Sequence, residues 1–213
     1  MNEHRSSAPP GVFRTALLGT CAALLVAPAW ATSVANFTLT DHSGTAHELY
    51  DYDDVKAVVI MIQGNGCPIV RNALIDLRAV RERFQGDPVR FLMLNSNLQD
   101  DAESIRDEAQ EWNIDLPILV DDTQEVGESL ELTRTAEMLV IDTRSWRIAY
   151  RGPINDRLVY ERQRAKADHH YVVDAVQAVL AGERPAVESV AAIGCLINFS
   201  GRSEPDPAET HHH

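Results

Sequence analysis

Cysteine is scarce in this sequence, which holds three cysteines among 213 residues. No cysteine has a second one three positions later, so the C-x-x-C pair of dithiol motifs and the paired spacing of zinc sites are both missing. A C-x-x-C motif that began at Cys67 would need its second thiol at position 70, which is Val70. Redox chemistry at Cys67 would therefore need a partner that is distant in the sequence.

Basic residues are also few, because 19 Lys and Arg stand against 32 Asp and Glu, for a formal net charge of −13. A chain this acidic, with no basic stripe, argues against nucleic-acid binding. No Gly-rich phosphate loop, Ser-His-Asp order or zinc-ligand spacing stands out. We therefore expect no cofactor, no metal site and no nucleic-acid partner.

Long apolar runs are missing, and the run closest to one, Thr15–Val26, is too short for a comfortable membrane span. Arg5 and Arg14 precede or border this run, and Ala29-Trp30-Ala31 follows it as a small-x-small cleavage site. We predict that residues 1–31 are a signal peptide that is removed on export to the periplasm, which leaves no stable membrane insertion. An uncleaved anchor is the alternative.

Export would change the count of cysteines. Cys21 would leave with the signal peptide, so that the mature chain would keep Cys67 and Cys195. Two cysteines in an oxidising compartment favour a disulfide. Such a bond could be a structural crosslink or a redox pair, and the spacing does not decide between them.

Strand-type and helix-type segments alternate along residues 32–200, without a repeat or a linker that would divide them. We therefore predict one α/β domain with a central mixed sheet, an N-terminal hairpin and a C-terminal extension. Expected strands cover 36–40, 46–49, the apolar first half of 56–71, 89–95, 116–120, 137–142, 146–150 and the apolar stretch 193–197. One helix is expected to begin at residue 68, and three further helices are expected over 100–112, 123–132 and 167–180.

The stretch 56–71 organises the rest of the chain. Its apolar first half is typical of a strand that is buried on both faces, and a loop with Gly64 and Gly66 follows. Cys67 and Pro68 then begin a helix, since proline suits the first helical turn. A thiol at this position faces unpaired N–H groups and the positive end of the helix dipole, which favour the reactive thiolate. The glycine loop should leave this sulfur accessible.

Several segments resemble the thioredoxin-like redoxins of the broad AhpC/TSA type over residues 36–182. They are Phe37-Thr38-Leu39 with Asp41 and Gly44, the strand–loop–helix around Cys67-Pro68, 117–121, 134–142 and Tyr150-Arg151-Gly152. The resemblance implies a thioredoxin-like fold and a thiol–disulfide oxidoreductase or thiol peroxidase. Protein thiols, disulfides or a peroxide would be its partners.

The chain departs from this family at two further positions. Peroxide-reducing members carry a Thr three residues before the reactive Cys, where this chain has Gly64. Thioredoxin folds carry a cis-proline opposite the reactive Cys, where this chain has Ala136. A cis bond before a residue other than proline costs about 3–4 kcal/mol, so we predict a trans bond between Thr135 and Ala136.

The resemblance implies Cys67 as the nucleophile and Cys195 as its resolving partner. Arg71, placed one turn into the helix, and Arg151 could lower the pKa of the thiol, although Arg151 could equally pair with Asp156. Gly66, Pro68 and Thr135 complete the predicted site.

An alternative to an enzyme remains at this stage. The scaffold could be a non-catalytic module that binds copper or a partner protein, with a structural Cys67–Cys195 disulfide.

His169 and His170 lie at a predicted helix start and could reach a site, although a solvated helix end is the simpler interpretation. His42 and His47 are expected at the surface. Residues 201–213 are expected to be a disordered tail whose final histidines, His211–His213, are natural or a tag.

Overall fold

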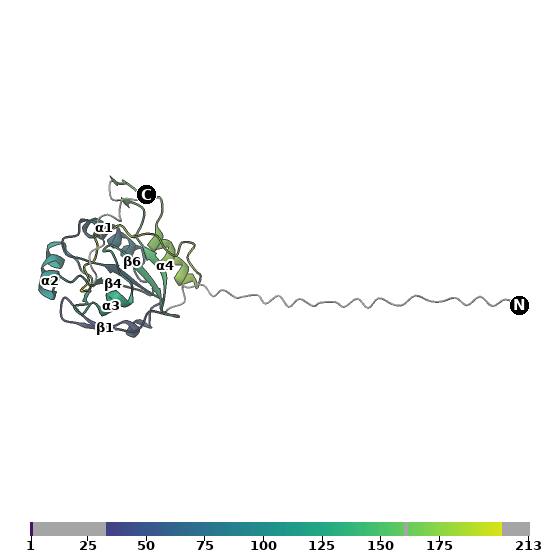
Figure 1. Cartoon of the computed structure of the whole chain (residues 1–213). Coiled ribbons are helices and arrows are strands. Elements are labelled where there is room, and N and C mark those ends of the chain that lie inside the picture. Colours follow the sequence, from purple (N-terminus) through teal and green to yellow (C-terminus); the bar gives the residue numbers. More distant parts are fainter. Residues whose placement is uncertain (2–32, 160–161, 202–213) are drawn as a thin grey trace. The chain divides into compact units, whose positions relative to one another are not determined.

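A computed structural model of the chain describes Met1 and residues 33–159 and 162–201 (Figure 1). The chain divides into two units, Met1–Trp30 and Ala31–His213, and the fold below is that of the second unit. Apart from Met1 and Gly201, the predicted signal peptide and the predicted tail lie outside the described residues, as do Cys21 and His211–His213.

Seven strands form one mixed sheet in the order β2-β1-β5-β4-β3-β6-β7. β5, β4 and β3 are parallel neighbours, whereas β1, β6 and β7 pair antiparallel to theirs. The bounds of these strands are β1 Thr38–Asp41, β2 Ala46–Glu48, β3 Ala57–Ile62, β4 Val89–Asn95, β5 Ile118–Val120, β6 Met138–Asp142 and β7 Arg147–Gly152. The predicted α/β fold class, with a mixed sheet flanked by helices, is confirmed.

The described part of the chain also contains four α-helices and one short 3-10 helix. They are η1 Leu49–Tyr52, α1 Pro68–Arg83, α2 Ala102–Glu111, α3 Glu125–Ser129 and α4 Tyr171–Ala181. Two segments that the sequence pattern does not predict, β8 Leu158–Val159 and β9 Arg162–Gln163, form a separate small hairpin.

Helix α4 begins later than the predicted residue 167. The backbone N–H groups of Asp168 and His169 both donate to the carboxylate of Asp156, at 2.8 and 3.0 Å. Arg164 also bonds to the carboxylates of Asp156 and Asp168. These bonds hold the two residues in a loop, so the helix starts at Tyr171. His169 and His170 belong to this exposed helix start.

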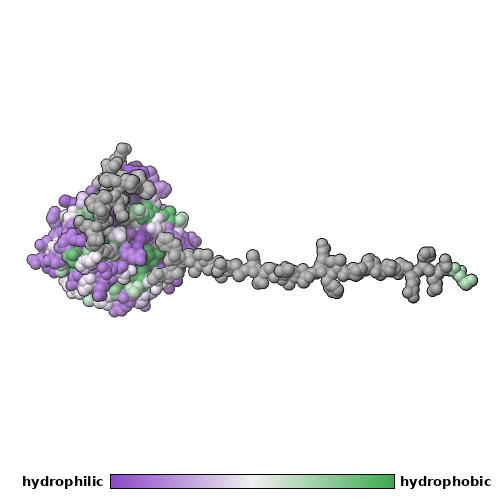
Figure 2. Space-filling model, viewed as in Figure 1, coloured by the Kyte–Doolittle hydropathy of each residue, from purple (hydrophilic) through white to green (hydrophobic). Residues whose placement is uncertain are grey.

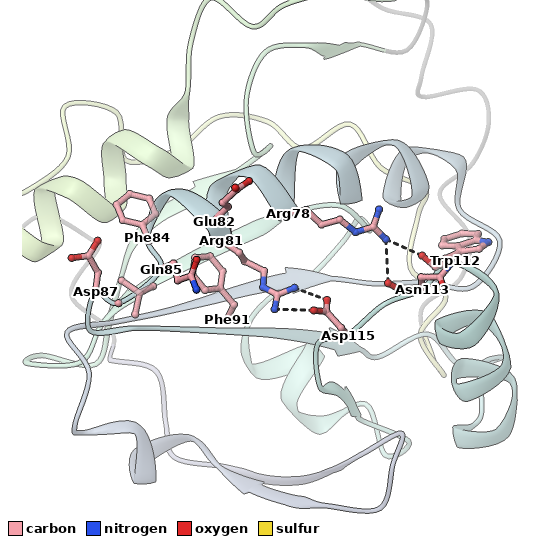
Figure 3. A pocket seen from close by; sticks show the side chains of 12 residues that line it. Arg78, Arg81, Glu82, Phe84, Gln85, Asp87, Phe91, Trp112, Asn113 and Asp115 are labelled. Atoms are coloured by element: carbon pink, nitrogen blue, oxygen red, sulfur yellow. Dashed lines mark hydrogen bonds and ion pairs between the residues drawn. The ribbon is translucent and has the colours of Figure 1, made fainter.

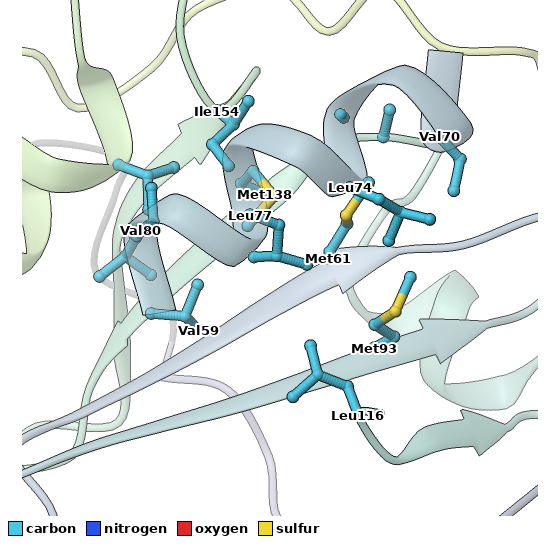
Figure 4. Packing of buried hydrophobic residues seen from close by; sticks show 14 of the residues in the cluster. Val59, Met61, Val70, Leu74, Leu77, Val80, Met93, Leu116, Met138 and Ile154 are labelled. Carbon is cyan, nitrogen blue, oxygen red and sulfur yellow. The ribbon is translucent and has the colours of Figure 1, made fainter. Parts of the chain in front are cut away.

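The central strand β3 is buried on both faces, as its apolar run predicts. Val59 and Met61 pack with α1, α2 and α4 on one side, whereas Val58 and Ile60 pack with η1 and α3 on the other. Figure 4 shows the first side, where Val59, Met61 and Met93 lie below the α1 residues. Figure 1 accordingly places α1 and α3 on opposite sides of the sheet. Each face of the sheet has its own apolar core, so the sheet lies between two layers of helices and loops.

A hydrogen-bonded chain of side chains closes the N-terminal hairpin. The Nε2 atom of His47 lies 2.9 Å from a carboxylate oxygen of Asp41, and its Nδ1 atom lies 2.6 Å from the hydroxyl of Tyr52. The side chain of His47 is only 13% exposed, so the expectation of a surface histidine is wrong there. Its two ring nitrogens both have partners because the hairpin turn brings Asp41 back to it.

Hydrophilic side chains cover most of the visible face of the domain, with apolar patches between them (Figure 2). Among the described residues, no helix is both long enough and apolar enough to cross a bilayer.

Candidate active site

Cys67 lies at the N-cap of α1, directly after the loop at the carboxyl end of β3. Pro68 occupies the first turn of the helix, where its missing N–H costs nothing. Gly66 has a φ of 70°, which a glycine adopts without strain. The sequence therefore places the thiol where the pattern predicts it. Cys67 is only 3% exposed, however, so the expectation of an accessible sulfur is wrong.

The segment after α4, residues 188–200, reaches Cys67 through Cys195, and we call it the C-terminal strap. The strap first runs beside β7, where Arg151 donates its N–H to Glu188 at 2.9 Å and accepts that of Val190 at 2.9 Å. It then reaches the loop before β6, where Thr135 donates its N–H to the carbonyl of Cys195 at 2.9 Å. The apolar stretch 193–197 is thus not a strand of the sheet but a bridge across its end.

Close packing between the strap and this loop depends on Gly194. A Cβ atom at this position would lie 1.6 Å from the carbonyl oxygen of Thr135. Only glycine, which has no Cβ atom, can therefore occupy position 194 on this path of the backbone. Two further bonds fix the path, because Ile197 donates its N–H to Thr133 at 2.9 Å and the guanidinium of Arg134 donates to the carbonyl of Gly194 at 2.9 Å.

The strap brings together the two cysteines that remain in the predicted mature chain. The sulfur atoms of Cys67 and Cys195 lie 2.9 Å apart, although 128 positions separate the residues. Both are free thiols here, Cys67 buried and Cys195 exposed. A disulfide requires about 2.05 Å between the sulfurs, so only a small further approach is needed once an oxidant removes two electrons from the pair.

Thr135 connects the two cysteines through its hydroxyl group. The hydroxyl oxygen lies 3.1 Å from the sulfur of Cys67 and accepts the backbone N–H of Cys195 at 3.0 Å. Because the oxygen accepts the hydrogen bond from Cys195 through a lone pair, the hydroxyl keeps its own proton to donate to the sulfur. Thr135 can therefore donate to a Cys67 thiolate.

The two thiols differ in acidity. Burial would raise the pKa of Cys67, but hydrogen bonds from Cys195, Thr135 and the backbone N–H of Val70 outweigh it, and the pKa lies below its ordinary value. Burial and the adjacent Cys67 sulfur raise the pKa of Cys195 to about 11. Of the two thiols, Cys67 is therefore the one that loses its proton first, and Cys195 is the one that keeps it.

Carboxylates from outside the loop hold the backbone that precedes Cys67. Glu108 accepts the N–H of Gly66 at 2.5 Å and the side-chain amide of Gln63 at 2.9 Å. Asp100 accepts the N–H of Asn65 at 2.9 Å. Burial raises the pKa of Glu108, while the bonds from Gly66 and Gln63 oppose this rise. These contacts fix where α1 begins and hence where the sulfur lies.

The two predicted arginines have partners elsewhere. The guanidinium of Arg71 lies over the ring of Trp112, 5.4 Å from its centroid. Arg151 bonds to the carbonyl of Leu130 and lies 3.6 Å from the carboxylate of Glu137. Neither contact involves the thiol, and Arg151 does not take Asp156 as its partner either. The pKa of Cys67 is therefore lowered by neutral hydrogen-bond donors of the backbone and of side chains, not by a guanidinium group.

Sequence reasoning missed how Thr135 and Gly64 belong together. A Cβ atom at Gly64 would lie 2.6 Å from the methyl carbon of Thr135. The space that a side chain at position 64 would need is therefore filled by Thr135, whose hydroxyl reaches the Cys67 sulfur from the loop before β6. The described residues contain no cis peptide bond, as predicted for Ala136, which adopts a φ of 58°.

An open pocket of about 770 Å³ lies at the other end of α1, away from both cysteines. Figure 3 shows its polar walls, where Arg81 pairs with Asp115 and Arg78 bonds to the carbonyls of Trp112 and Asn113. Its arginines are occupied by these partners. Among the described residues there is also no group of three or more His, Cys, Asp or Glu that could hold a metal.

Comparison with known proteins identifies the family of the chain. The model of the AhpC/TSA family matches residues 31–174. The chain belongs to the AhpC/TSA family. This match covers the β3–loop–α1 unit of Cys67 and the loop of Thr135, but it ends before the strap. No curated protein matches the chain significantly.

Solved structures similar to this AhpC/TSA chain include proteins without an assigned activity. One, an uncharacterised conserved protein from Geobacillus kaustophilus, is 26% identical with a TM-score of 0.72, over 82% of this chain and 94% of that one. Another, a hypothetical protein from Sinorhizobium meliloti, is 24% identical with a TM-score of 0.69, over 81% and 96%. A peroxidoxin from Mycobacterium tuberculosis is 17% identical with a TM-score of 0.50, over 71% and 93%, and shares the fold.

Proposed function

We propose that this AhpC/TSA protein is a thiol–disulfide oxidoreductase whose redox centre is the pair Cys67 and Cys195. The observation that carries the proposal is the 2.9 Å approach of their sulfurs, one of which has a lowered pKa. A thiolate beside a thiol can lose two electrons and one proton to form an intramolecular disulfide. The oxidant would be a partner disulfide or a peroxide, as family membership suggests.

The same geometry argues against the alternative of a copper-binding module. Metal–sulfur bonds are about 2.3 Å long, so two thiolates on one tetrahedral ion lie roughly 3.8 Å apart. Sulfurs at 2.9 Å would have to separate to admit the ion, whereas they need only a slight approach to form a disulfide. We therefore favour electron transfer over metal binding.

An assay of both activities tests the proposed function. Wild-type protein, Cys67→Ser and Cys195→Ser would be compared for exchange with oxidised glutathione and for reduction of hydrogen peroxide by the protein dithiol. We expect at least one activity in the wild type, with intramolecular disulfide as product, and none of that product in either variant. If Cys67→Ser retains full activity, or if the wild type has neither activity, the proposal is wrong.

We also propose that the protein works outside the cytoplasm, in the periplasm, after removal of residues 1–31. The short apolar run with its Ala29-Trp30-Ala31 site supports this. N-terminal sequencing of protein from a periplasmic extract tests it, and we expect Thr32 as the first residue. Protein that keeps Met1 and stays in the cytoplasmic fraction would contradict export.

A further inference from the structure

The loop before Cys67 contains the sequence Asn65-Gly66, and no other asparagine of the chain is followed by glycine. In such a pair the backbone nitrogen of the glycine can attack the side-chain amide of the asparagine, because glycine has no Cβ atom that hinders the approach. Gly66 is exposed, and apart from its chain neighbours no atom lies within 4 Å of the place where a Cβ atom would stand. The loop therefore has the residues and the open space that asparagine deamidation requires.

The side chain of Asn65 is held by a buried neighbour. Gln63, which is fully buried, donates its side-chain amide to the Oδ1 atom of Asn65 at 2.9 Å. Gln63 is itself fixed, since its Oε1 atom accepts the side-chain amide of Asn95 at 2.5 Å. A fixed donor at a carbonyl oxygen stabilises the negative charge that develops there when a nucleophile adds to the carbon. Gln63 therefore favours attack on the amide of Asn65.

A carboxylate opposes the reaction by holding the attacking nitrogen. Glu108 accepts the N–H of Gly66 at 2.5 Å. A carboxylic acid is far more acidic than a peptide N–H, so the proton stays on the nitrogen and the contact is a restraint. Ring closure requires rotation about the Cα–C bond of Asn65, which breaks this contact. The hydrogen bond that closes the turn, from the N–H of Cys67 to the carbonyl of Gly64, is long at 3.3 Å and restrains the rotation less.

We propose that Asn65 is a site of spontaneous deamidation in the folded protein, and that Glu108 limits its rate by restraining the nitrogen of Gly66. The modification itself does not depend on the proposed function, whereas its effect on the cysteine pair rests on that function. The loop before Cys67 is then a place where the protein changes with age and without another enzyme.

The reaction consumes only water and transfers no electrons. The nitrogen of Gly66 gives its proton to solvent and bonds to the Cγ atom of Asn65. The bond between Cγ and Nδ2 breaks, and Nδ2 takes up a proton and leaves as ammonia. Water then opens the cyclic imide. Attack at Cγ gives aspartate, and attack at the backbone carbonyl gives isoaspartate, whose main chain runs through Cβ and Cγ.

Either product disturbs the start of α1. Gln63 donates to the side chains of both Asn65 and Glu108 at 2.9 Å, so a new carboxylate at position 65 lies one side chain away from that of Glu108. Repulsion between the two charges weakens the hold of Glu108 on the loop. Isoaspartate also adds a methylene group to the main chain directly before the helix. Both changes displace Cys67 from Cys195, whose sulfur lies 2.9 Å away.

Peptide mapping of aged wild-type protein tests the site. The full chain would be kept for several days in warm, mildly alkaline buffer, digested, and examined by mass spectrometry for replacement of –NH2 by –OH. Asn113 is the internal reference, because it is exposed but is followed by Ile114, whose branched side chain hinders attack. We expect Asn65 to deamidate at least about tenfold faster than Asn113, with isoaspartate among the products. Equal rates, or aspartate alone, would overturn the proposal.

A pair of variants tests the restraint. Glu108→Ala removes the acceptor of the Gly66 N–H, whereas Glu111→Ala removes an exposed carboxylate of the same helix. We expect deamidation of Asn65 at least about tenfold faster in Glu108→Ala than in Glu111→Ala, because a hydrogen bond to a charged group is lost. Equal rates would overturn the restraint, as would an equal rise at Asn113, which would show general opening of the fold. The mapping of wild-type protein stays decisive in either case.

The effect on the cysteine pair is tested with Asn65→Asp, which is one of the two products. Thiol trapping during mild oxidation should show slower closure of the Cys67–Cys195 disulfide in Asn65→Asp than in the control Asn113→Asp. Equal closure would contradict the displacement of Cys67. Failure of unaged wild-type protein to form this disulfide would instead defeat the proposed function, and the deamidation result would stand by itself.

Discussion

The hydroxyl oxygen of Thr135 lies 3.1 Å from the sulfur of Cys67 and 3.0 Å from the backbone nitrogen of Cys195. One side chain can therefore stabilise a thiolate at Cys67 and also position Cys195. Because Gly64 leaves room for the methyl group of Thr135, the hydroxyl reaches the sulfur from the loop before β6.

Replacing Thr135 with Val should raise the pKa of Cys67. A hydrogen bond to a charged group contributes about 1.5–3 kcal/mol, which corresponds to a rise of about one to two pH units. The ultraviolet absorbance of the thiolate, titrated in the Cys195→Ser background with and without Thr135→Val, measures this. Thr133→Val, at an exposed position of the same loop, is the control and should leave the titration unchanged. An unaltered pKa in Thr135→Val would show that the hydroxyl does not donate to the sulfur.

The reduced pair should make stability depend on pH in two opposite ways. The lowered pKa of Cys67 stabilises the fold above the ordinary thiol pKa, and this contribution is lost as pH falls through the folded value. The raised pKa of Cys195, about 11, stabilises the fold below the ordinary value, and this contribution is lost as pH rises toward 11. The contribution of the pair therefore peaks near the ordinary thiol pKa, about 8.5.

Urea unfolding under reducing conditions checks this at several pH values. In Cys195→Ser, the loss of stability between about 8.5 and 11 should be smaller than in the wild type, since only the wild type keeps a proton on Cys195 there. Parallel curves for the two proteins would contradict the assignment of thiolate to Cys67 and thiol to Cys195.

Replacing Asp41 with Asn should weaken the N-terminal hairpin. Burial would raise the pKa of Asp41, but bonds from Ser43, His47 and Thr45 lower it to about 2. The carboxylate therefore contributes fully above its unfolded pKa of about 4, and the contribution is lost as pH falls toward 2. We expect Asp41→Asn to lower the free energy of unfolding near neutral pH by about 2 kcal/mol.

Acid-unfolding curves of Asp41→Asn and of the exposed control Asp51→Asn make the comparison. The stability lost between about pH 4 and 2 should be smaller in Asp41→Asn. Equal losses in both variants would show that the hairpin network does not stabilise the fold.

Replacing Glu108 with Gln should loosen the loop before Cys67. The carboxylate accepts the N–H of Gly66 and the amide of Gln63, and an amide side chain turns one of its two acceptors into a donor. We expect a loss of about 1–3 kcal/mol in stability and slower closure of the Cys67–Cys195 disulfide. Thiol trapping during mild oxidation measures the rate, with exposed Glu111→Gln as control. An unchanged rate would mean that this contact does not position the sulfur.

Much of the fold follows from local patterns. The apolar run of β3 and the glycine loop before Cys67-Pro68 predict the central strand, the turn and the helix start, because each depends on residues that are neighbours in sequence. The trans bond before Ala136 also follows from local energetics. The position of Cys67 at the start of α1 was predictable because it depends only on this strand, this loop and Pro68.

The path of the strap was not predictable in the same way. It depends on contacts between residues 133–135 and 194–197, which no periodicity encodes. The need for Gly194 appears only when Thr135 is packed against it. Arg151 and His47 were misjudged for a similar reason, since Glu137 and Asp41 reach them through strand pairing and a turn. Long-range pairing thus determined the partners that the sequence left open.

The central claim is that Cys67 and Cys195 form one reversible redox pair in the folded protein. Thiol mapping by mass spectrometry, on folded protein with and without mild reductant, tests it most directly. We predict a Cys67–Cys195 disulfide after mild oxidation that mild reductant opens without unfolding. A disulfide that opens only when the protein unfolds, or thiols that never join, would contradict the account.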